Sequence, residues 1–251
     1  MSTLTTKDFF SKDAVKNKFQ ELLGKRSAGF ITSVLQICNN NDLLAKAEPA
    51  SIFNAAAMAA TLDLPINANL GFAYIVPYGG EAQFQIGYKG FIQLAQRSGQ
   101  VKKIYASEIY EGEISKADPL SGYEFDFSNR GTSEQSTKIV GFASRLELIN
   151  GFESTLYMTV EQLKSHGQKF SKTYKKGFGV WKDDFDGMAK KTVIKLLLAK
   201  YAPLTVDVQK AIMADQSVIN DVDTMDTTYI DNMNEPPTID LEAAKKGVVN
   251  D

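Results

Sequence analysis

Cysteine and histidine are almost absent from this chain, whose 251 residues include one of each, Cys38 and His166. A single cysteine cannot form an internal disulfide, and the two residues together cannot supply the ligands of an ordinary zinc site. Cys38 falls on the apolar side of a helical pattern, so we expect it in the core. His166 stands beside Gly167, and we interpret it as a solvated loop or helix-end residue rather than a catalytic base.

Long apolar runs and a phosphate-binding glycine loop are also missing. A membrane-spanning helix needs about 20 apolar residues, and the polar start MSTLTTKDFF lacks the apolar core of a signal peptide. We therefore expect a soluble protein of a reducing, cytoplasmic compartment, with no membrane partner. Gly24-Lys25 lacks the upstream glycine of a P-loop, which argues against nucleotide hydrolysis.

The acidic group Asp183, Asp184 and Asp186 is the one candidate for a metal site. These carboxylates could hold Mg²⁺, but acidic residues at this kind of position more often cap a helix and interact with its dipole. We favour the cap, and we expect neither a required cofactor nor a catalytic residue.

The net charge of −2 hides an uneven distribution. Residues 161–200 carry 10 basic and 4 acidic side chains, a net charge of +6, whereas residues 201–251 carry 3 and 10, a net charge of −7. A basic segment of this kind attracts polyanions, and the acidic segment could compete for that site or recruit another partner.

The hydrophobic periodicity predicts an α+β fold, in which helices pack on a small antiparallel sheet made of a hairpin and later strands. We divide the chain into a helical region over residues 1–40, assigned to oligomerisation, a core over 41–214, and a flexible acidic tail over 215–251. Helices are expected over 7–24, 27–40, 49–60, from 88, from 159 or 160, and from 183 or 184 to about 201. Strands are expected over 72–78, 82–86, 101–111, 123–127, 137–149 and 152–159.

The segment EAQFQIGYKGFIQLAQRSGQV, residues 81–101, changes from a strand into a helix at Gly87-Tyr88-Lys89-Gly90. Lys89, Gln93 and Arg97 recur every four residues and so form one polar stripe. A helix N-terminus suits phosphate, and the two glycines allow either an anion or another backbone segment to come close. A solvated lysine at an ordinary strand-to-helix turn is the alternative.

The segment HGQKFSKTYKKGFGVWK, residues 166–182, alternates lysine with aromatic residues in what we interpret as a glycine-containing loop. Lysines can follow a phosphate backbone while aromatic rings stack on unpaired bases. The stacking candidates are Phe170, Tyr174, Phe178 and Trp181, of which Trp181 is also the best candidate for anchoring the loop to the core. Lys191 and Lys195 share a face of the following helix, which could instead be a solvated lysine face.

Two blocks of the sequence resemble the RecT-type family of phage and prophage single-strand annealing proteins. They are LPINANLGFAYIVPYGGEAQFQIGYKGFIQLAQRSGQV and VWKDDFDGMAKKTVIKLLLAKY, and the resemblance covers about residues 41–201. It implies an ATP-independent recombinase that coats single-stranded DNA, pairs it into duplex, and forms homo-oligomeric rings or helical filaments in the bacterial host cell. It also implies a 5′-to-3′ exonuclease and the host single-strand-binding protein as partners.

The resemblance places Tyr88, Lys89 and Arg97 on one wall of a DNA groove and Lys190, Lys191 and Lys195 on the other. We add as DNA-binding candidates Lys102, Lys103, Lys172, Lys175 and Lys176. Two other functions stay open, a passive single-strand-binding protein and a Mg²⁺-dependent DNA-processing enzyme.

Overall fold

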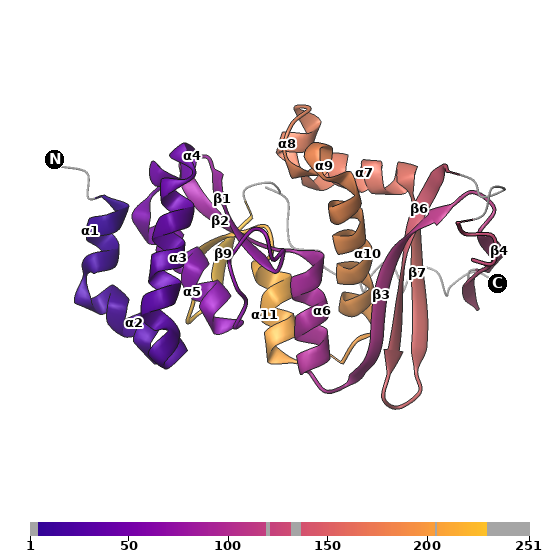
Figure 1. The fold of residues 1–251 in the computed structure, drawn as a ribbon, viewed down its shortest axis with the longest axis horizontal. Coiled ribbons are helices and arrows are strands. Elements are labelled where there is room, and N and C mark those ends of the chain that lie inside the picture. The colour runs from indigo at the N-terminus through magenta and orange to yellow at the C-terminus, as the bar shows by residue number, and fades with distance from the viewer. Residues whose placement is uncertain (1–4, 119–120, 132–136, 204, 230–251) are drawn as a thin grey trace, which may run out of the picture.

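The computed structural model describes residues 5–118, 121–131, 137–203 and 205–229. The molecule is elongated, with N-terminal helices at one end and a three-stranded sheet at the other (Figure 1). Between them lie helices α6 (Tyr88–Arg97), α10 (Phe185–Tyr201) and α11 (Val206–Ala214). The expected α+β class is confirmed. No helix within the described residues is long and apolar enough to cross a membrane.

The N-terminal end is helical, as the sequence predicts, but the helix expected over 7–24 is two helices. Lys12 has an extended backbone (φ −63°, ψ 138°), and the bend brings Phe10 against Phe19 and Phe53, with ring centroids 6.1 and 6.5 Å away. Aromatic burial therefore outweighs helix continuity here. The elements are α1 (Thr6–Ser11), α2 (Asp13–Leu23), a 3-10 turn (Gly24–Arg26), α3 (Ser27–Asn39), α4 (Asp42–Ala45) and α5 (Pro49–Thr61).

The predicted hairpin is present as β1 (Ala73–Tyr78) and β2 (Glu81–Ile86). Gly79 and Gly80 form its turn with φ of 62° and 89°, a region that favours glycine. Buried side chains of the hairpin join those of the N-terminal helices, α6, α10 and α11 in one continuous core. The N-terminal helices are thus packed as part of the main body, and Cys38 lies in that core as expected.

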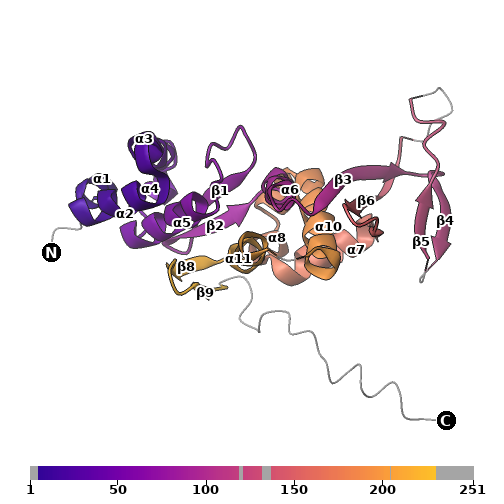
Figure 2. The ribbon, with the colours of Figure 1, turned by 90° about the horizontal axis from the view of Figure 1, so that it is seen from below.

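The far end is an antiparallel sheet in the order β3-β6-β7, formed by β3 (Val101–Tyr110), β6 (Ile139–Leu148) and β7 (Glu153–Thr159). Helix α10 covers one face of this sheet, where Phe142 of β6 packs with Ala189 and Val193. A separate hairpin, β4 (Ile114–Asp118) and β5 (Gly122–Phe125), projects beyond the sheet (Figure 2). Strand β4 was not predicted.

The segment over 166–182 is mainly helical rather than one loop, and residues 176–179 form the connection between its last two helices. Its elements are α7 (Val160–Phe170), α8 (Lys172–Lys175) and α9 (Val180–Asp183). Thr159 caps α7 by a reciprocal capping box with Gln162, and Gly179 turns the chain into α9 with a φ of 92°. Local side-chain caps therefore organise a stretch whose composition alone is typical of a loop.

The expected tail boundary at residue 215 is wrong. After α11 the chain forms β8 (Val218–Asp221) and β9 (Asp226–Thr228), and β8 packs against α5 and β2 (Figure 2). Val218 and Ile219 are buried, and the amide of Phe84 donates to the Ser217 carbonyl over 2.9 Å. A few well-placed apolar residues are enough to hold an acidic segment on the core. Residues 230–251 of the proposed tail lie outside the described residues.

Candidate nucleic-acid interface

The N-terminal ends of α6 and α10 meet beside strand β1, although about a hundred residues separate them in the sequence. Tyr74 of β1 lies in this junction, where burial raises the pKa of its hydroxyl, and the charges of Asp184 and Tyr88 add to the effect. The junction therefore collects groups from the GYKG turn, the hairpin and the start of α10.

The two glycines of the GYKG turn allow close approach of another backbone segment and do not form an open site for an anion. A Cβ on Gly87 would lie 2.1 Å from the Gly71 carbonyl oxygen, and one on Gly90 would lie 2.2 Å from the Phe72 carbonyl oxygen. The amide of Gly87 also donates to the Phe72 carbonyl over 2.9 Å. Of the two alternatives that the sequence left open, the structure shows close approach of another backbone segment.

Lys89 is exposed at the first turn of α6. Its stem passes Gly71, where an added Cβ would lie 3.5 Å from Lys89 Cδ. Within the part of the chain that the structure describes, no carboxylate pairs with Lys89. The ammonium group is thus available at a helix N-terminus, where the helix dipole also favours an anion.

Lys190 lies on α10 and forms an ion pair with Glu108 of β3 over 2.9 Å, with its side chain 24% exposed. Burial works against the charged form, but the hydrogen bond and charge of Glu108 and the nearby Tyr88 raise the pKa of Lys190. Lys190 is therefore charged and held next to Tyr88. The structure thus places Lys190 next to Tyr88, the residue before Lys89 at the start of α6, and their role in binding DNA stays a prediction.

Lys191 and Lys195 do not line that site as free cations. Both ammonium groups donate to the buried carboxylate of Asp215, over 2.7 and 2.8 Å, and Asp215 also accepts from the amide of Ile86. Lys191 is 4% exposed. This corrects the interpretation of Lys191 as a phosphate ligand, because its face of α10 turns into the core. Lys195 keeps a side-chain exposure of 25% but has the same partner.

Arg97 and the pair Lys102 and Lys103 lie away from Lys89. Eight residues of α-helix place Arg97 about 12 Å farther along α6. It donates to the Leu62 carbonyl and pairs with Asp63. Lys102 and Lys103, at the start of β3, both pair with Glu147, at 2.5 and 3.4 Å. These three cations are not brought together with Lys89 and Lys190.

Most aromatic residues of the basic segment are occupied in packing. The ring of Trp181 lies 5.8 Å from that of Tyr174 and 6.1 Å from that of His166, and His166 lies 4.5 Å from Phe170. Trp181 is buried, which confirms it as the anchor and removes it as a stacking candidate. Tyr174 and Phe170 are half-buried, so their inward faces are taken by this cluster.

His166 belongs to the same aromatic cluster and is half-buried within α7, whereas the sequence-based interpretation expected a solvated residue. Burial lowers the pKa of its imidazole to about 4, with smaller contributions from Lys195 and Lys169. Gly167 makes the packing possible, because an added Cβ would lie 3.0 Å from both the Trp181 and Tyr174 rings. The imidazole is therefore neutral at physiological pH and holds α7 against α9.

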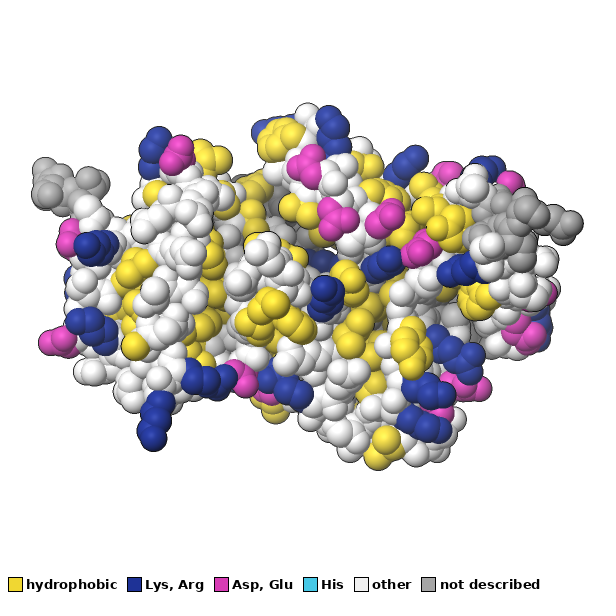
Figure 3. Space-filling model, in the orientation of Figure 1, with side chains coloured by type: hydrophobic (Ala, Val, Ile, Leu, Met, Phe, Trp, Pro, Cys, Tyr) yellow, Lys and Arg dark blue, Asp and Glu magenta, His cyan; other side chains and the backbone are white. Residues whose placement is uncertain are grey.

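Phe178 is the stacking candidate that remains accessible, with 54% exposure. Lys175 and Lys176 are exposed beside it, and Lys172 is half-buried. Figure 3 shows Lys and Arg side chains around a recess below α8 and α9, with carboxylates close by. Asp184 caps α10 by accepting from the Gly187 amide over 3.0 Å, as the cap interpretation expects.

The sequence did not predict a role at this site for three of its residues, Tyr74, Glu108 and Asp215. A tyrosine and a glutamate on strands give no local signal of a partner on a distant helix. Asp215 resembled the first residue of an acidic tail, and nothing near it in the sequence marks it as a buried counter-ion.

The sequence pattern of the RecT family matches residues 28–228, from α3 to the last residue of β9. The chain belongs to the RecT family. This match reaches well beyond the two blocks that first suggested it and includes the β8–β9 segment, in agreement with the packing of that segment on the core.

Two curated relatives of the chain are similar to it over most of their length. An uncharacterised protein of Bacillus subtilis (strain 168), YqaK, is 47% identical over 220 residues, which cover 87% of this chain and 75% of that protein. Protein RecT of Escherichia coli (strain K12) is 27% identical over 195 residues, which cover 74% of this chain and 70% of that protein.

Proposed function

We propose that this RecT-family protein anneals complementary single strands of DNA in recombination, without nucleotide hydrolysis. The observation that carries the proposal is the junction of α6 and α10, where Lys89 and Lys190 lie beside Tyr88 and Tyr74 within a region matched by the family. The exposed Lys175 and Lys176 at the end of α8 and the ring of Phe178 extend the basic, aromatic surface.

The reaction is physically reasonable without a nucleotide cofactor. Each base-pair step formed releases about 1.4 kcal/mol on average, so pairing itself supplies the driving force. The barrier comes from repulsion between two phosphate backbones and from hairpins within each strand. Lysines that neutralise phosphates, and rings that hold bases unpaired, lower that barrier.

The proposal includes assembly into a homo-oligomer, a ring or a filament, with the helical region over residues 1–40 as the contact region. A repeated site would hold many nucleotides in register, and head-to-tail contacts supply such repetition. A 5′-to-3′ exonuclease and the host single-strand-binding protein are the proposed partners, since the first exposes single strands and the second occupies them. The setting is the cytoplasm of the bacterial host.

A fluorescence annealing assay with two complementary oligonucleotides, without nucleotide, tests the proposal. We expect the wild-type protein to accelerate pairing, and Lys89→Glu or Lys190→Glu to slow it and weaken single-strand binding. Lys46→Glu is the matched control, since Lys46 is exposed at the end of α4 in the N-terminal part. Tight binding without faster annealing would indicate a passive single-strand-binding protein, and Mg²⁺-dependent cleavage of the oligonucleotides would indicate a processing enzyme.

A further inference from the structure

A half-open cavity of about 470 Å³ lies on the side of the β3-β6-β7 sheet that α10 does not cover. Its floor includes Tyr105 of β3 and Arg145 of β6, which are directly paired across the two strands. Their neighbours Ile104 and Leu146 are buried in the core, so alternation along the strands directs Tyr105 and Arg145 to the opposite face. The cavity is thus separate from the α6–α10 junction.

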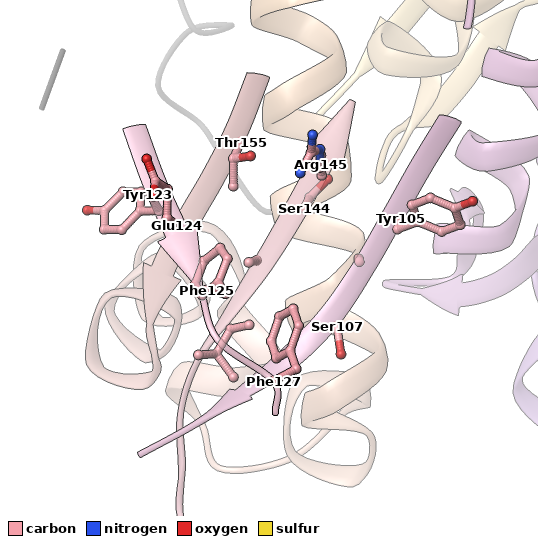
Figure 4. A pocket seen from close by; sticks show the side chains of 12 residues that line it. Tyr105, Ser107, Tyr123, Glu124, Phe125, Phe127, Ser144, Arg145 and Thr155 are labelled. Carbon is pink, nitrogen blue, oxygen red and sulfur yellow. The ribbon is translucent and has the colours of Figure 1, made fainter. Parts of the chain in front are cut away.

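One wall of the cavity is a row of three aromatic rings, Tyr123, Phe125 and Phe127 (Figure 4). Successive ring centroids are 6.4 and 5.8 Å apart, and the ring planes differ by only 14° and 10°. Tyr105 is 62% exposed and Phe127 is 46% exposed. Large flat apolar groups are therefore open to solvent in a cavity whose size falls in the range of sites for drug-sized ligands, about 300–1,000 Å³.

Phe127 is held in place from behind by a partly buried ion pair. The guanidinium of Arg130 lies 4.7 Å from the Phe127 ring centroid and donates to both carboxylate oxygens of Glu113 over 2.7 and 2.6 Å. The hydrogen bond from Arg130 lowers the pKa of Glu113, whose side chain is 8% exposed, so the pair is charged. A ring fixed in this way loses little conformational entropy when it stacks on a ligand.

One exposed cation, Arg145, lines the cavity, and others lie on strands β3 and β4. Arg145 is 61% exposed and Lys116 is 45% exposed. Lys103, two residues before Tyr105 on the same strand face, is 53% exposed. The carboxylate partners of Arg145 and Lys116, Glu153 and Glu124, lie at the surface, where an ion pair contributes at most about 1 kcal/mol. Phosphates can therefore replace those carboxylates at little cost, which favours a polyanion with flat apolar groups as the occupant.

We propose that this cavity is a second single-strand site, which takes unpaired nucleobases of DNA. Bases stack on Tyr105, Phe125 and Phe127, and the flanking phosphates contact Arg145 and Lys103. The inference rests on the proposed function, since annealing requires a second strand near a protein that already holds the first. Two sites on different faces let one protomer hold one strand at the α6–α10 junction and meet another strand at the sheet.

The first experiment places a reporter in the cavity. Tyr105→Trp keeps a stacking ring and adds an exposed indole, whereas the native Trp181 is buried. We expect oligothymidylate to quench the added indole and an abasic oligonucleotide of equal length and charge to leave it unquenched. Absence of quenching at a concentration where anisotropy shows saturated DNA binding would overturn the second site and leave the proposed function standing. Equal quenching by both oligonucleotides would also overturn it, because bases would not be the cause.

The second experiment removes the rings. Tyr105→Ala with Phe127→Ala should weaken oligothymidylate binding about 5- to 150-fold for each lost stack that contributes in the wild type, and leave abasic binding unchanged. Tyr105→Phe should retain affinity. Phe152→Ala, which removes an exposed ring at the β6–β7 turn outside the cavity, is the matched control. If the double variant instead lowers the oligomeric state in light scattering and keeps base-dependent binding, the cavity is a protein contact and the proposal fails. If the wild-type protein does not accelerate annealing at all, the proposed function itself is refuted.

Discussion

Lys191 donates a hydrogen bond to Asp215, with 2.7 Å between Lys191 Nζ and Asp215 Oδ1, and both side chains are buried. This contact joins the middle of α10 to the turn after α11. Burial alone would raise the pKa of Asp215, but the charges of Lys191 and Lys195 lower it, so the carboxylate is ionised. The ion pair therefore fixes the C-terminal segment to the helix that also carries Lys190.

Removing one partner of this pair should destabilise the fold. Lys191→Ala leaves the Asp215 charge with Lys195 alone, and loss of one member of a buried pair typically costs about 3–5 kcal/mol. Chemical denaturation with circular dichroism measures the change. Lys200→Ala, at an exposed position of the same helix, should change the free energy of unfolding by less than about 0.5 kcal/mol. A stable Lys191→Ala protein with weakened DNA binding would return Lys191 to the DNA site.

Truncation on either side of β8 and β9 should have opposite effects on stability. A chain that ends at residue 214 loses Asp215 and the buried residues Val218 and Ile219. Burial of each of the two apolar side chains contributes about 1.5–3 kcal/mol. We expect that chain to be unfolded or strongly destabilised in a thermal melt. A chain that ends at residue 229 should melt close to the full-length protein and retain annealing of bare oligonucleotides. Equal stability of the two truncated chains would show that β8 and β9 contribute nothing.

The GYKG glycines should be intolerant of alanine. In Gly90→Ala the new Cβ would lie 2.2 Å from the Phe72 carbonyl oxygen and 2.7 Å from Ile86 Cγ2, so backbone must move. We expect a loss of more than about 2 kcal/mol in the free energy of unfolding. Gly29→Ala is the control, because Gly29 lies in α3 with nothing within 4 Å, and alanine there should stabilise the helix by about 0.5–1 kcal/mol. Similar results at both positions would contradict the close backbone approach.

His166 should make stability depend on mildly acidic pH. Its pKa is about 4 in the folded protein and 6.5 when unperturbed, so the unfolded chain binds a proton first as the pH falls. The stabilisation is complete above pH 6.5 and is lost between pH 6.5 and 4, with a change of about 2 kcal/mol from pH 7 to pH 5. In His166→Phe, which keeps an aromatic ring, this part of the pH dependence should disappear. An unchanged pH profile would mean that His166 titrates normally.

DNA binding should depend on salt, with a measurable share from Lys89. Each phosphate neutralised on a single strand adds about −0.7 to the slope of log affinity against log salt concentration. Lys89→Ala should make the slope shallower by about that amount, whereas Lys46→Ala should leave it unchanged. Tyr88→Ala should weaken binding more than Tyr88→Phe if the ring stacks or packs. A slope unaffected by Lys89→Ala would remove the GYKG turn from the DNA site.

The sequence by itself determined many of the helices and strands and several of their ends. Period-two patterns predicted β6 and β7, and in the turn between them Gly151 has a φ of 86°. Asp184 marked the start of α10 and Pro49 that of α5. These signals are local, because capping and turn conformations depend on residues within three or four positions. The family resemblance was visible for the same reason, since it is carried by continuous blocks.

The tertiary structure alone decided which charged and aromatic residues are free to act. Lys190 and Lys191 are adjacent in sequence, yet one lies at the junction with Tyr88 and the other is buried against Asp215. Trp181 and Phe178 belong to one segment, but only Phe178 is open to solvent. Composition predicts that lysines and aromatic residues are concentrated in one segment. Packing between distant segments determines whether each of these side chains points to the core or to solvent. Burial and pairing depend on residues brought together by folding, so no local pattern contains them.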